Sequence, residues 1–342
     1  MVEKPKNATN DTANSKKRVI VVVNKYWECD PVCWVLTNSY LTDECNYTDK
    51  KYIIDLDVEN SLTLLTYPTY GSAKPFEGSG TIPRMVFETE KRNIEVWCIS
   101  DLLSNSGSEL QSSSEEKMKL LPQIYEYEYL GEKLDIEMVI AVGTASAGPC
   151  VTSDSPFGTD NINGAVIIGS NVFMHDGWEQ GSLSKFECDC WGQIMPSCSN
   201  DYIRELEEVD FKNYKGLMLS PPNNPSTVET PVYVSENYVA LGSVNVTNYN
   251  SYSTKDKETA KTFFENYPGS HDGVSLETTH CLIYLAAKDY LCSNPPFMFV
   301  SGIVDRFLCF DSDVDPTPYA QNVSGAHNAG VTVAYIISQL EK

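Results

Sequence analysis

Basic side chains are scarce in this sequence of 342 residues, which carries 25 Lys and Arg against 47 Asp and Glu and has a formal net charge of -22. Binding to a nucleic-acid backbone or to an anionic membrane surface depends on a basic surface. We therefore expect neither a nucleic acid polymer nor a membrane as a partner. A small anionic ligand stays open, because one local basic pocket would suffice for it.

Long apolar runs are also missing, since no stretch approaches the roughly 20 residues that span a bilayer. Residues 1–17 are polar and rich in Lys, Asn and Thr. We expect a disordered tail there and no signal peptide. Triplets of the form Asn-x-Ser/Thr, such as those at Asn46 and Asn245, matter only in a secreted protein. The sequence leaves the compartment open between a cytoplasmic protein and a mature secreted one.

The sequence also lacks a set of residues with the spacing of metal ligands. The eleven cysteines cannot all pair within one chain, because their number is odd. Their one dense cluster, Cys188, Cys190 and Cys198, lacks the paired C-x-x-C spacing of a zinc site, and the four histidines do not supply the missing ligands. We therefore expect no metal and no cofactor.

Strand-like runs alternate with helical patterns along the remaining chain, and this order predicts a mostly parallel sheet. Arg18–Val23 is a continuous β-branched run, typical of a parallel strand buried on both faces. Met138–Val142 and Ala165–Phe173 predict further strands, and an amphipathic helix at Glu115–Leu130 precedes the first of these. We expect a single domain over residues 18–342.

The first candidate functional residue lies in the stretch P-P-F-M-F-V-S-G-I-V-D-R-F at 295–307. Phe297–Ser301 predicts a buried strand, and Asp305 and Arg306 follow it closely. Ligands of open α/β sheets bind beyond the carboxyl ends of strands, so an acid at this place is a candidate for a site. An exposed aspartate in a turn is the structural alternative.

A second candidate acid stands just upstream. The segment Val274–Lys288 predicts a helix with Leu276, Cys281 and Leu285 on its buried side. Glu277 lies at the start of that helix, where the helix dipole favours an acid even without a function.

These two segments together resemble the nucleoside phosphorylase/nucleosidase superfamily, in which a helix with M-E-x-x-A precedes a strand ending in I-S-D. A third block, A-V-G-T-A-S-A-G-P at 141–149, is similar to the family's V-G-T-A-G-G strand and turn. A fourth, G-A-V-I-I-G-S-N-V-F-M-H-D-G at 164–177, is similar to its G-D-I-V-I and Y-H-D segments. The blocks follow one another in the family's order.

The resemblance implies a three-layer α/β/α sandwich with a central twisted, mostly parallel sheet. It also implies that the substrate is a purine nucleoside and that the protein is a homo-oligomer, as in the purine nucleoside phosphorylases and the methylthioadenosine/S-adenosylhomocysteine nucleosidases. The segment near 179–231, which includes the cysteine cluster, looks inserted or enlarged by comparison.

The same resemblance implies roles for individual residues. Asp305 would protonate the leaving base at nitrogen seven, with a pKa raised by partial burial. Glu277 would accept hydrogen bonds from the 2′ and 3′ hydroxyls of the ribose, and Leu276 replaces the usual methionine beside that sugar. Tyr249 takes the place of an aromatic residue that stacks on the base, although Asn248 stands where an acid is usual.

The nucleophile separates the enzymes of the superfamily. In its hydrolytic branch a glutamate in the loop after the first strand activates water, and Glu28 resembles this glutamate. The alternative is that Glu28 is only a charge at the start of a helix that Asp30 caps. The phosphorylases of the superfamily hold phosphate with arginines, but Ala141 stands at one of these arginine positions here. Only Thr144, after a turn at Gly143, fits the phosphate site.

We therefore expect a purine nucleosidase that hydrolyses an adenosine-type nucleoside. Arg306 would either hold the carboxylate of Asp305 or be a solvated surface charge. Two alternatives stay open: a phosphorylase on the same scaffold, and a non-catalytic protein that binds or stores nucleosides.

Overall fold

The computed structural model describes residues 16–37, 63–64, 85–88, 91–99, 114–128, 133–147, 161–174, 194–195, 197, 200–211, 218–224, 231–242, 274–277, 279–291, 295–306, 310–314 and 316–340. Tyr249, Asn248 and the cysteine cluster lie outside these residues, as does the predicted tail up to residue 15.

The described strands form one mixed sheet. They span Lys17–Val23 (β1), Thr63–Leu64 (β2), Met85–Glu88 (β3), Arg92–Cys98 (β4), Ile136–Ala147 (β5), Val166–Gly169 (β6), Asn171–Met174 (β7), Ile194–Met195 (β8), Val232–Val234 (β9), Val239–Gly242 (β10), Val274–Glu277 (β11) and Phe297–Arg306 (β12). Their order along the sheet is β2-β3-β4-β1-β5-β11-β10-β7-β8, with β12 beside β5 and β6, and β9 beside β6.

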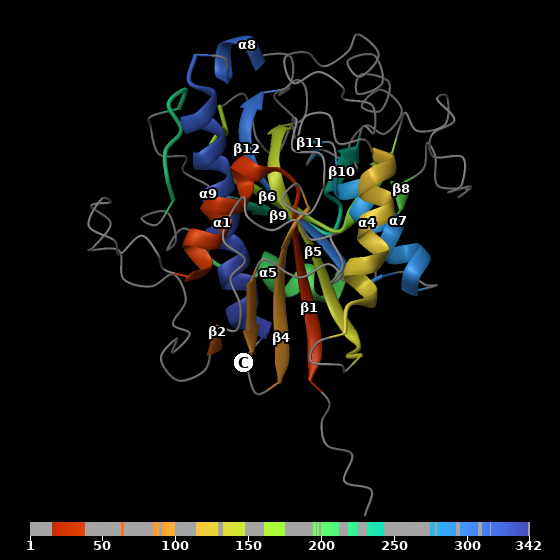
Figure 1. The fold of residues 1–342 in the computed structure, drawn as a ribbon. Helices are drawn as coiled ribbons and strands as arrows, with labels where there is room; N and C mark the ends of the chain where they lie inside the picture. The colour runs from red at the N-terminus through yellow and green to blue at the C-terminus, as the bar shows by residue number, and fades with distance from the viewer. Residues whose placement is uncertain are drawn as a thin grey trace, which may run out of the picture.

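The described helices lie on both faces of this sheet (Figure 1). They span Tyr26–Thr37 (α1), Ser114–Glu126 (α4), Asn200–Glu207 (α5), His280–Leu291 (α7), Phe310–Asp313 (α8) and Pro318–Leu340 (α9). None of the helices that the structure describes is both long enough and apolar enough to cross a bilayer.

Parallel pairing dominates the centre of the sheet. β1 runs parallel to both β4 and β5, and β5 runs parallel to β12. The carboxyl ends of these strands therefore meet at one edge, which is the upper edge in Figure 1. This edge is where an α/β sheet binds its ligands.

Strand β1 shows how the two cores arise. Val19, Val21 and Val23 pack into one hydrophobic cluster, together with α1 and α9. Ile20 and Val22, which alternate with them, pack into the other cluster with α4 and α7. Because both faces are covered, the run is apolar at every position rather than at every second one. The three-layer α/β/α sandwich with a mostly parallel sheet is confirmed.

A buried ion pair fixes the orientation of α4. Arg18, at the amino end of β1, binds Glu95 through two nitrogens at 2.7 and 2.8 Å. Its guanidinium also donates to the carbonyl oxygens of Ile124 and Tyr125, in the last turn of α4, at 2.7 Å each. The last turn of α4 thus lies at the amino edge of the sheet, and its first turn points toward the carboxyl edge, as Figure 1 shows.

Several predicted boundaries were wrong, most of them at strand ends. The helix predicted at Val274–Lys288 is strand β11 followed by α7, because Val274–Glu277 pairs with β10 and so forms a ladder that overrides its helical pattern. The strand predicted to end at Ser301 continues to Arg306, because it stays paired with β5. The single strand predicted at Ala165–Phe173 is two strands, which break at Ser170.

Candidate active site

Strand β5 carries the centre of the site. It continues through Gly143, which the sequence predicted to be a turn, and remains paired with β12 as far as Ala147. A Cβ atom at Gly143 would lie 3.2 to 3.4 Å from the carboxylate of Glu28, so the glycine makes room for an acid rather than for a turn. Thr144 and Ser146, two residues apart, point to the same face of the strand. Each of them binds one of the predicted catalytic carboxylates.

Glu28 lies in the first turn of α1 and binds Thr144. One carboxylate oxygen, Oε1, accepts hydrogen bonds from the backbone N–H of Thr144 at 2.7 Å and from its hydroxyl at 2.6 Å. The other oxygen accepts from the backbone N–H of Lys25 at 2.9 Å, as the glutamate of a capping box does. Asp30 lies inside α1 and is not its cap. Glu28 thus caps its helix and also reaches the site.

Asp305 binds the other β5 hydroxyl. The Oγ of Ser146 lies 2.9 and 2.8 Å from the two carboxylate oxygens of Asp305, to which it donates. Only 2% of Asp305 is exposed. Burial raises its pKa to about 7, and the charge of Asp313 adds to this, whereas Ser146 and Lys25 work against it. A carboxyl group in this state holds a proton part of the time at neutral pH.

Glu277 ends β11 and caps α7. Its Oε2 accepts from the backbone N–H of Thr279, and its Oε1 accepts from that of His280 at 2.7 Å. Each carboxylate oxygen keeps acceptor capacity for a further partner. Burial raises the pKa of Glu277 to about 7, although these two hydrogen bonds and the charges of Lys25 and Lys117 oppose the shift.

Two lysines, Lys117 and Lys25, interact with these acids through their charges. Lys117, in the first turn of α4, is 8% exposed. Burial and the charge of Lys25 lower its pKa to about 8, against the attraction of Glu277 and Glu28. Lys25, two residues after β1, has its Nζ 5.0 Å from the ring centroid of Trp27. The charges of two lysines therefore act on these carboxylates, and neither of the two cations is an arginine.

His280 completes the buried polar cluster. Its Nδ1 lies 3.7 Å from Oε1 of Glu277 and 3.4 Å from the Oγ of Ser301. Burial lowers the pKa of His280 to about 3, so its imidazole is neutral at neutral pH.

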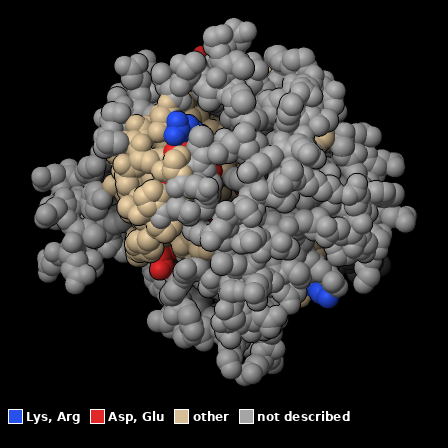
Figure 2. All heavy atoms as spheres, turned by 90° about the horizontal axis from the view of Figure 1, so that it is seen from above, with Lys and Arg blue, Asp and Glu red and all other residues tan. Residues whose placement is uncertain are grey.

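The acids of the site are buried rather than displayed. Seen from above, the described part of the carboxyl edge is mostly uncharged, with a basic group at one border beside acidic atoms (Figure 2). Glu28, Asp305 and Glu277 are 1%, 2% and 8% exposed. Among the residues that the structure describes, no group of three or more His, Cys, Asp or Glu side chains could hold a metal ion.

Known proteins share this architecture but little of the sequence. No family model matches the chain, and no curated protein matches it in sequence. The apo structure of the 5′-methylthioadenosine nucleosidase of Arabidopsis thaliana is similar to it with a TM-score of 0.53 and 12% identity, over 95% of this chain and 96% of that chain. An MTA/SAH nucleosidase gives a TM-score of 0.51 and 12% identity, over 96% of this chain and 97% of that one.

The protein has the nucleoside phosphorylase/nucleosidase fold. At 12% identity the similarity establishes the fold alone, because one fold carries many different activities.

The structure brings most of the predicted site residues together. Glu28, Thr144, Glu277 and Asp305 lie at the carboxyl edge around β5. Leu276 pairs with Ser146 on β5 and is 2% exposed.

Arg306 follows Asp305 on β12, and neighbouring residues of a strand point to opposite sides. The guanidinium of Arg306 binds Asp313 of α8, with Nε at 2.9 Å from Oδ2 and Nη2 at 2.7 Å from Oδ1. This ion pair ties Arg306 to α8, while 39% of its side chain stays exposed. The two roles that the sequence left open for Arg306 stay predictions.

Sequence reasoning missed Ser146, Lys117 and Asp313. Ser146 had a usable signal, since it stands two residues after Thr144 in an apolar run and would share its face in a strand. The interpretation of Gly143 as a turn concealed this. Lys117 and Asp313 had no such signal, because each reaches the site from a different element.

Proposed function

We propose that this protein is a purine nucleosidase, which hydrolyses the N-glycosidic bond of an adenosine-type nucleoside to the free base and ribose. The 5′-methylthioadenosine nucleosidase among its structural neighbours favours an adenosine-type substrate. No cofactor takes part in the proposed reaction.

The position of Glu28 carries the choice of water as the nucleophile. Its carboxylate accepts from the N–H and the hydroxyl of Thr144 and from the N–H of Lys25. A bound phosphate would need such donors for its own oxygens. Because an anionic side chain of the protein already occupies them, a second anion there would be repelled, whereas a neutral water molecule would not.

The proposed mechanism assigns a step to each acid. Asp305, partly protonated at neutral pH, gives its proton to nitrogen seven of the leaving base. Glu277 accepts hydrogen bonds from the ribose hydroxyls and stabilises the positive charge that develops on the sugar ring. Glu28 takes a proton from the attacking water, whose hydroxyl group adds to the anomeric carbon. Leu276 beside the sugar and Tyr249 on the base stay in the proposal as binding residues.

A phosphorylase is the second candidate, and the two lysines favour it. The charges of Lys25 and Lys117 act on the site carboxylates, and lysine can bind phosphate as a point charge. A non-catalytic binding or storage protein is the third candidate. Three buried acids are costly to keep in a protein that does not use them, which speaks against it.

One assay separates the three candidates. The protein is incubated with adenosine, 5′-methylthioadenosine, inosine and uridine, with and without phosphate, and the free base is followed. We expect base release from the adenosine-type substrates without phosphate and no large acceleration by phosphate. A many-fold acceleration would select the phosphorylase, and no release under either condition would select the binding protein.

A variant tests the role of Glu28 directly. Glu28→Gln should lower base release by roughly 10²–10⁴-fold, the usual contribution of a general base. Added phosphate should not rescue it, and a nucleoside analogue should still bind. Asp30→Asn is the matched control, since it removes an acid from the same helix and should leave turnover near the wild-type value.

A further inference from the structure

Strand β12 contains a bulge immediately before Asp305. Along the ladder with β5, Ile303 lies opposite Ala145 and Asp305 lies opposite Ser146, so Val304 is the extra residue. Ile303 itself is held on its other side, by hydrogen bonds of 2.8 Å to the N–H of Gly164 and to the carbonyl of Ala165. A bulge bends its strand and changes the direction of the next side chain. Here the next side chain is the proposed general acid.

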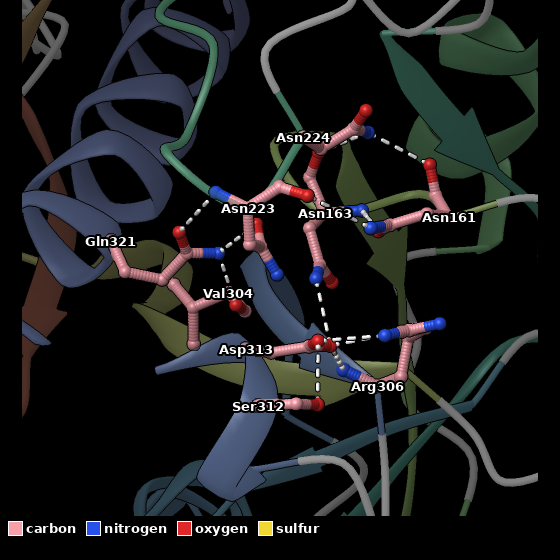
Figure 3. A network of polar contacts seen from close by, with 9 residues as sticks. All are labelled: Asn161, Asn163, Asn223, Asn224, Val304, Arg306, Ser312, Asp313 and Gln321. Atoms are coloured by element: carbon pink, nitrogen blue, oxygen red, sulfur yellow. Dashed lines mark hydrogen bonds and ion pairs between the residues drawn. The ribbon is translucent and has the colours of Figure 1, made fainter. Parts of the chain in front are cut away.

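The carbonyl of the bulged residue is held by a buried amide. Gln321, in the first turns of α9, is fully buried, and its Nε2 donates to the carbonyl oxygen of Val304. The same Nε2 donates to Oδ1 of Asn223 at 2.6 Å, and its Oε1 accepts from the backbone N–H of Asn223. Both ends of the Gln321 amide are therefore used (Figure 3).

The residue after Asp305 is held by a carboxylate. The backbone N–H of Arg306 donates to Oδ2 of Asp313 at 2.9 Å, in addition to the two bonds from its guanidinium. Asn163 donates to the same carboxylate oxygen at 3.0 Å. Burial works to raise the pKa of Asp313, but these bonds from Arg306 and Asn163 bring it down to about 2, so the group is ionised.

Asparagines join the two supports, as Figure 3 shows. Nδ2 of Asn224 donates to the carbonyl oxygens of Asn161 and Asn163, at 2.8 and 3.0 Å. Nδ2 of Asn161 donates in turn to the carbonyl of Asn223, at 3.3 Å. The segment 218–224 is thus linked to Gln321 on one side of Asp305 and to Asn163 and Asp313 on the other.

We propose that Gln321 and Asp313 are positioning residues, which hold the peptide groups on either side of Asp305 and so aim its carboxyl group at the leaving base. The proposal rests on the proposed role of Asp305 as general acid. A buried amide network that served only for stability would need no focus, whereas this one converges on the two residues that flank a single carboxyl group.

Asp313 also acts on Asp305 through its charge. The groups that act on Asp305 are Ser146 on β5, Asp313 on α8, and Lys25 after β1, while Arg306 next to it is engaged by Asp313. Removing the charge of Asp313 should therefore lower the pKa of Asp305, and the released Arg306 cation acts in the same direction.

Gln321→Met tests the first support. Methionine fills a similar volume without the amide, so the Val304 carbonyl loses its donor. We expect kcat to fall about 10- to 100-fold with a much smaller change of KM, because a small misplacement of a catalytic group costs rate rather than binding. Asn171→Leu is the matched control: Asn171 also donates to two backbone carbonyls, of Glu236 and Tyr238, but on β7. It should keep the wild-type kcat.

Asp313→Asn tests the second support, and it carries the test if Gln321→Met does not fold. A general acid works only while protonated, so activity falls as the pH rises through its pKa. With that pKa lowered, the basic limb of the kcat/KM profile should move to lower pH. Asp289→Asn, which removes an exposed acid from α7, controls for the change in net charge and should leave the profile in place.

The outcomes separate the positioning role from the proposed function. If Asp305→Asn is inactive but Gln321→Met keeps the wild-type kcat and Asp313→Asn keeps the wild-type profile, the positioning role is overturned and the nucleosidase stands. If the wild type is inactive on every nucleoside, the proposed function fails. The positioning role then fails as well, because it rests on Asp305 acting on a leaving base.

Discussion

The protonation of the candidate site is set by burial of individual side chains more than by pairs of charges. Asp305 and Glu277 have their pKa raised to about 7 by burial, and Lys117 has its pKa lowered to about 8 by the same cause. Groups that titrate near neutral pH are the ones that acid–base chemistry needs. Glu277 has to be ionised to accept from the ribose, and Asp305 has to be protonated to donate, so their values close to 7 give a bell-shaped profile.

Lys117 occupies a position that is unfavourable for a cation. It is buried, and it stands in the first turn of α4, where the helix dipole repels positive charge. Its charge lowers the pKa of Glu277. We expect Lys117→Met to raise that pKa and so to move the acid limb of the kcat/KM profile to higher pH.

The measurement is the pH dependence of base release between about pH 5 and 9. Lys119→Met is the matched control, because Lys119 is an exposed lysine of the same helix, and its profile should coincide with that of the wild type. An unchanged acid limb in Lys117→Met would show that Lys117 does not act on Glu277.

At the scale of elements, α9 packs directly on the backbone of β12. A Cβ atom at Gly302 would lie 1.9 Å from the carbonyl oxygen of Gly325, and one at Gly325 would lie 2.4 Å from Val304. This close approach places Gln321, one turn before Gly325, beside the bulge that precedes Asp305. The glycines thus serve the site by allowing two elements to touch.

Gly302→Ala should therefore destabilise the protein by about 3 kcal/mol, at the upper end of the usual cost of overpacking, because its Cβ meets backbone that cannot move aside. Gly330→Ala is the control on α9, where the new Cβ would lie 3.1 Å from Cα of Val32 and 3.3 Å from Val35. There the gain in helix propensity of about 1 kcal/mol offsets much of the crowding. Urea unfolding measures both, and equal costs would contradict the packing argument.

For the molecule as a whole, the buried acids predict how stability depends on pH. The pKa of Asp305 is raised on folding from 3.8 to about 7. The folded state thus binds the proton more tightly than the unfolded state, and this contribution to stability is complete below about pH 4 and is lost as the pH rises through 7.

Asp305→Asn has no such group. Its free energy of unfolding relative to the wild type should therefore rise between about pH 4 and 8, by at most a few kcal/mol. Denaturant titrations at several pH values measure this difference, and a constant offset would show that the carboxyl group is not perturbed in the folded protein.

The homo-oligomer implied by the resemblance stays a prediction.

The sequence by itself determined the fold and indicated the candidate acids. An apolar β-branched run such as Val19–Val23 favours a strand that is covered on both faces, because such burial removes all its side chains from water. The order of four short blocks was enough to predict the nucleoside phosphorylase/nucleosidase fold. The same blocks indicated Glu28, Glu277 and Asp305 as candidate acids, and the structure places these at one edge of the sheet.

Only the tertiary structure decided what these acids contact. Glu28 and Thr144 are 116 residues apart in the sequence, and Ser146 and Asp305 are 159 apart. Local periodicity tells which face of its own element a residue occupies, but partners across the sheet depend on strand register, and a single extra residue such as Val304 changes that register. For the same reason the sequence could indicate Asp305 as an acid but not the amide and the carboxylate that hold it in place.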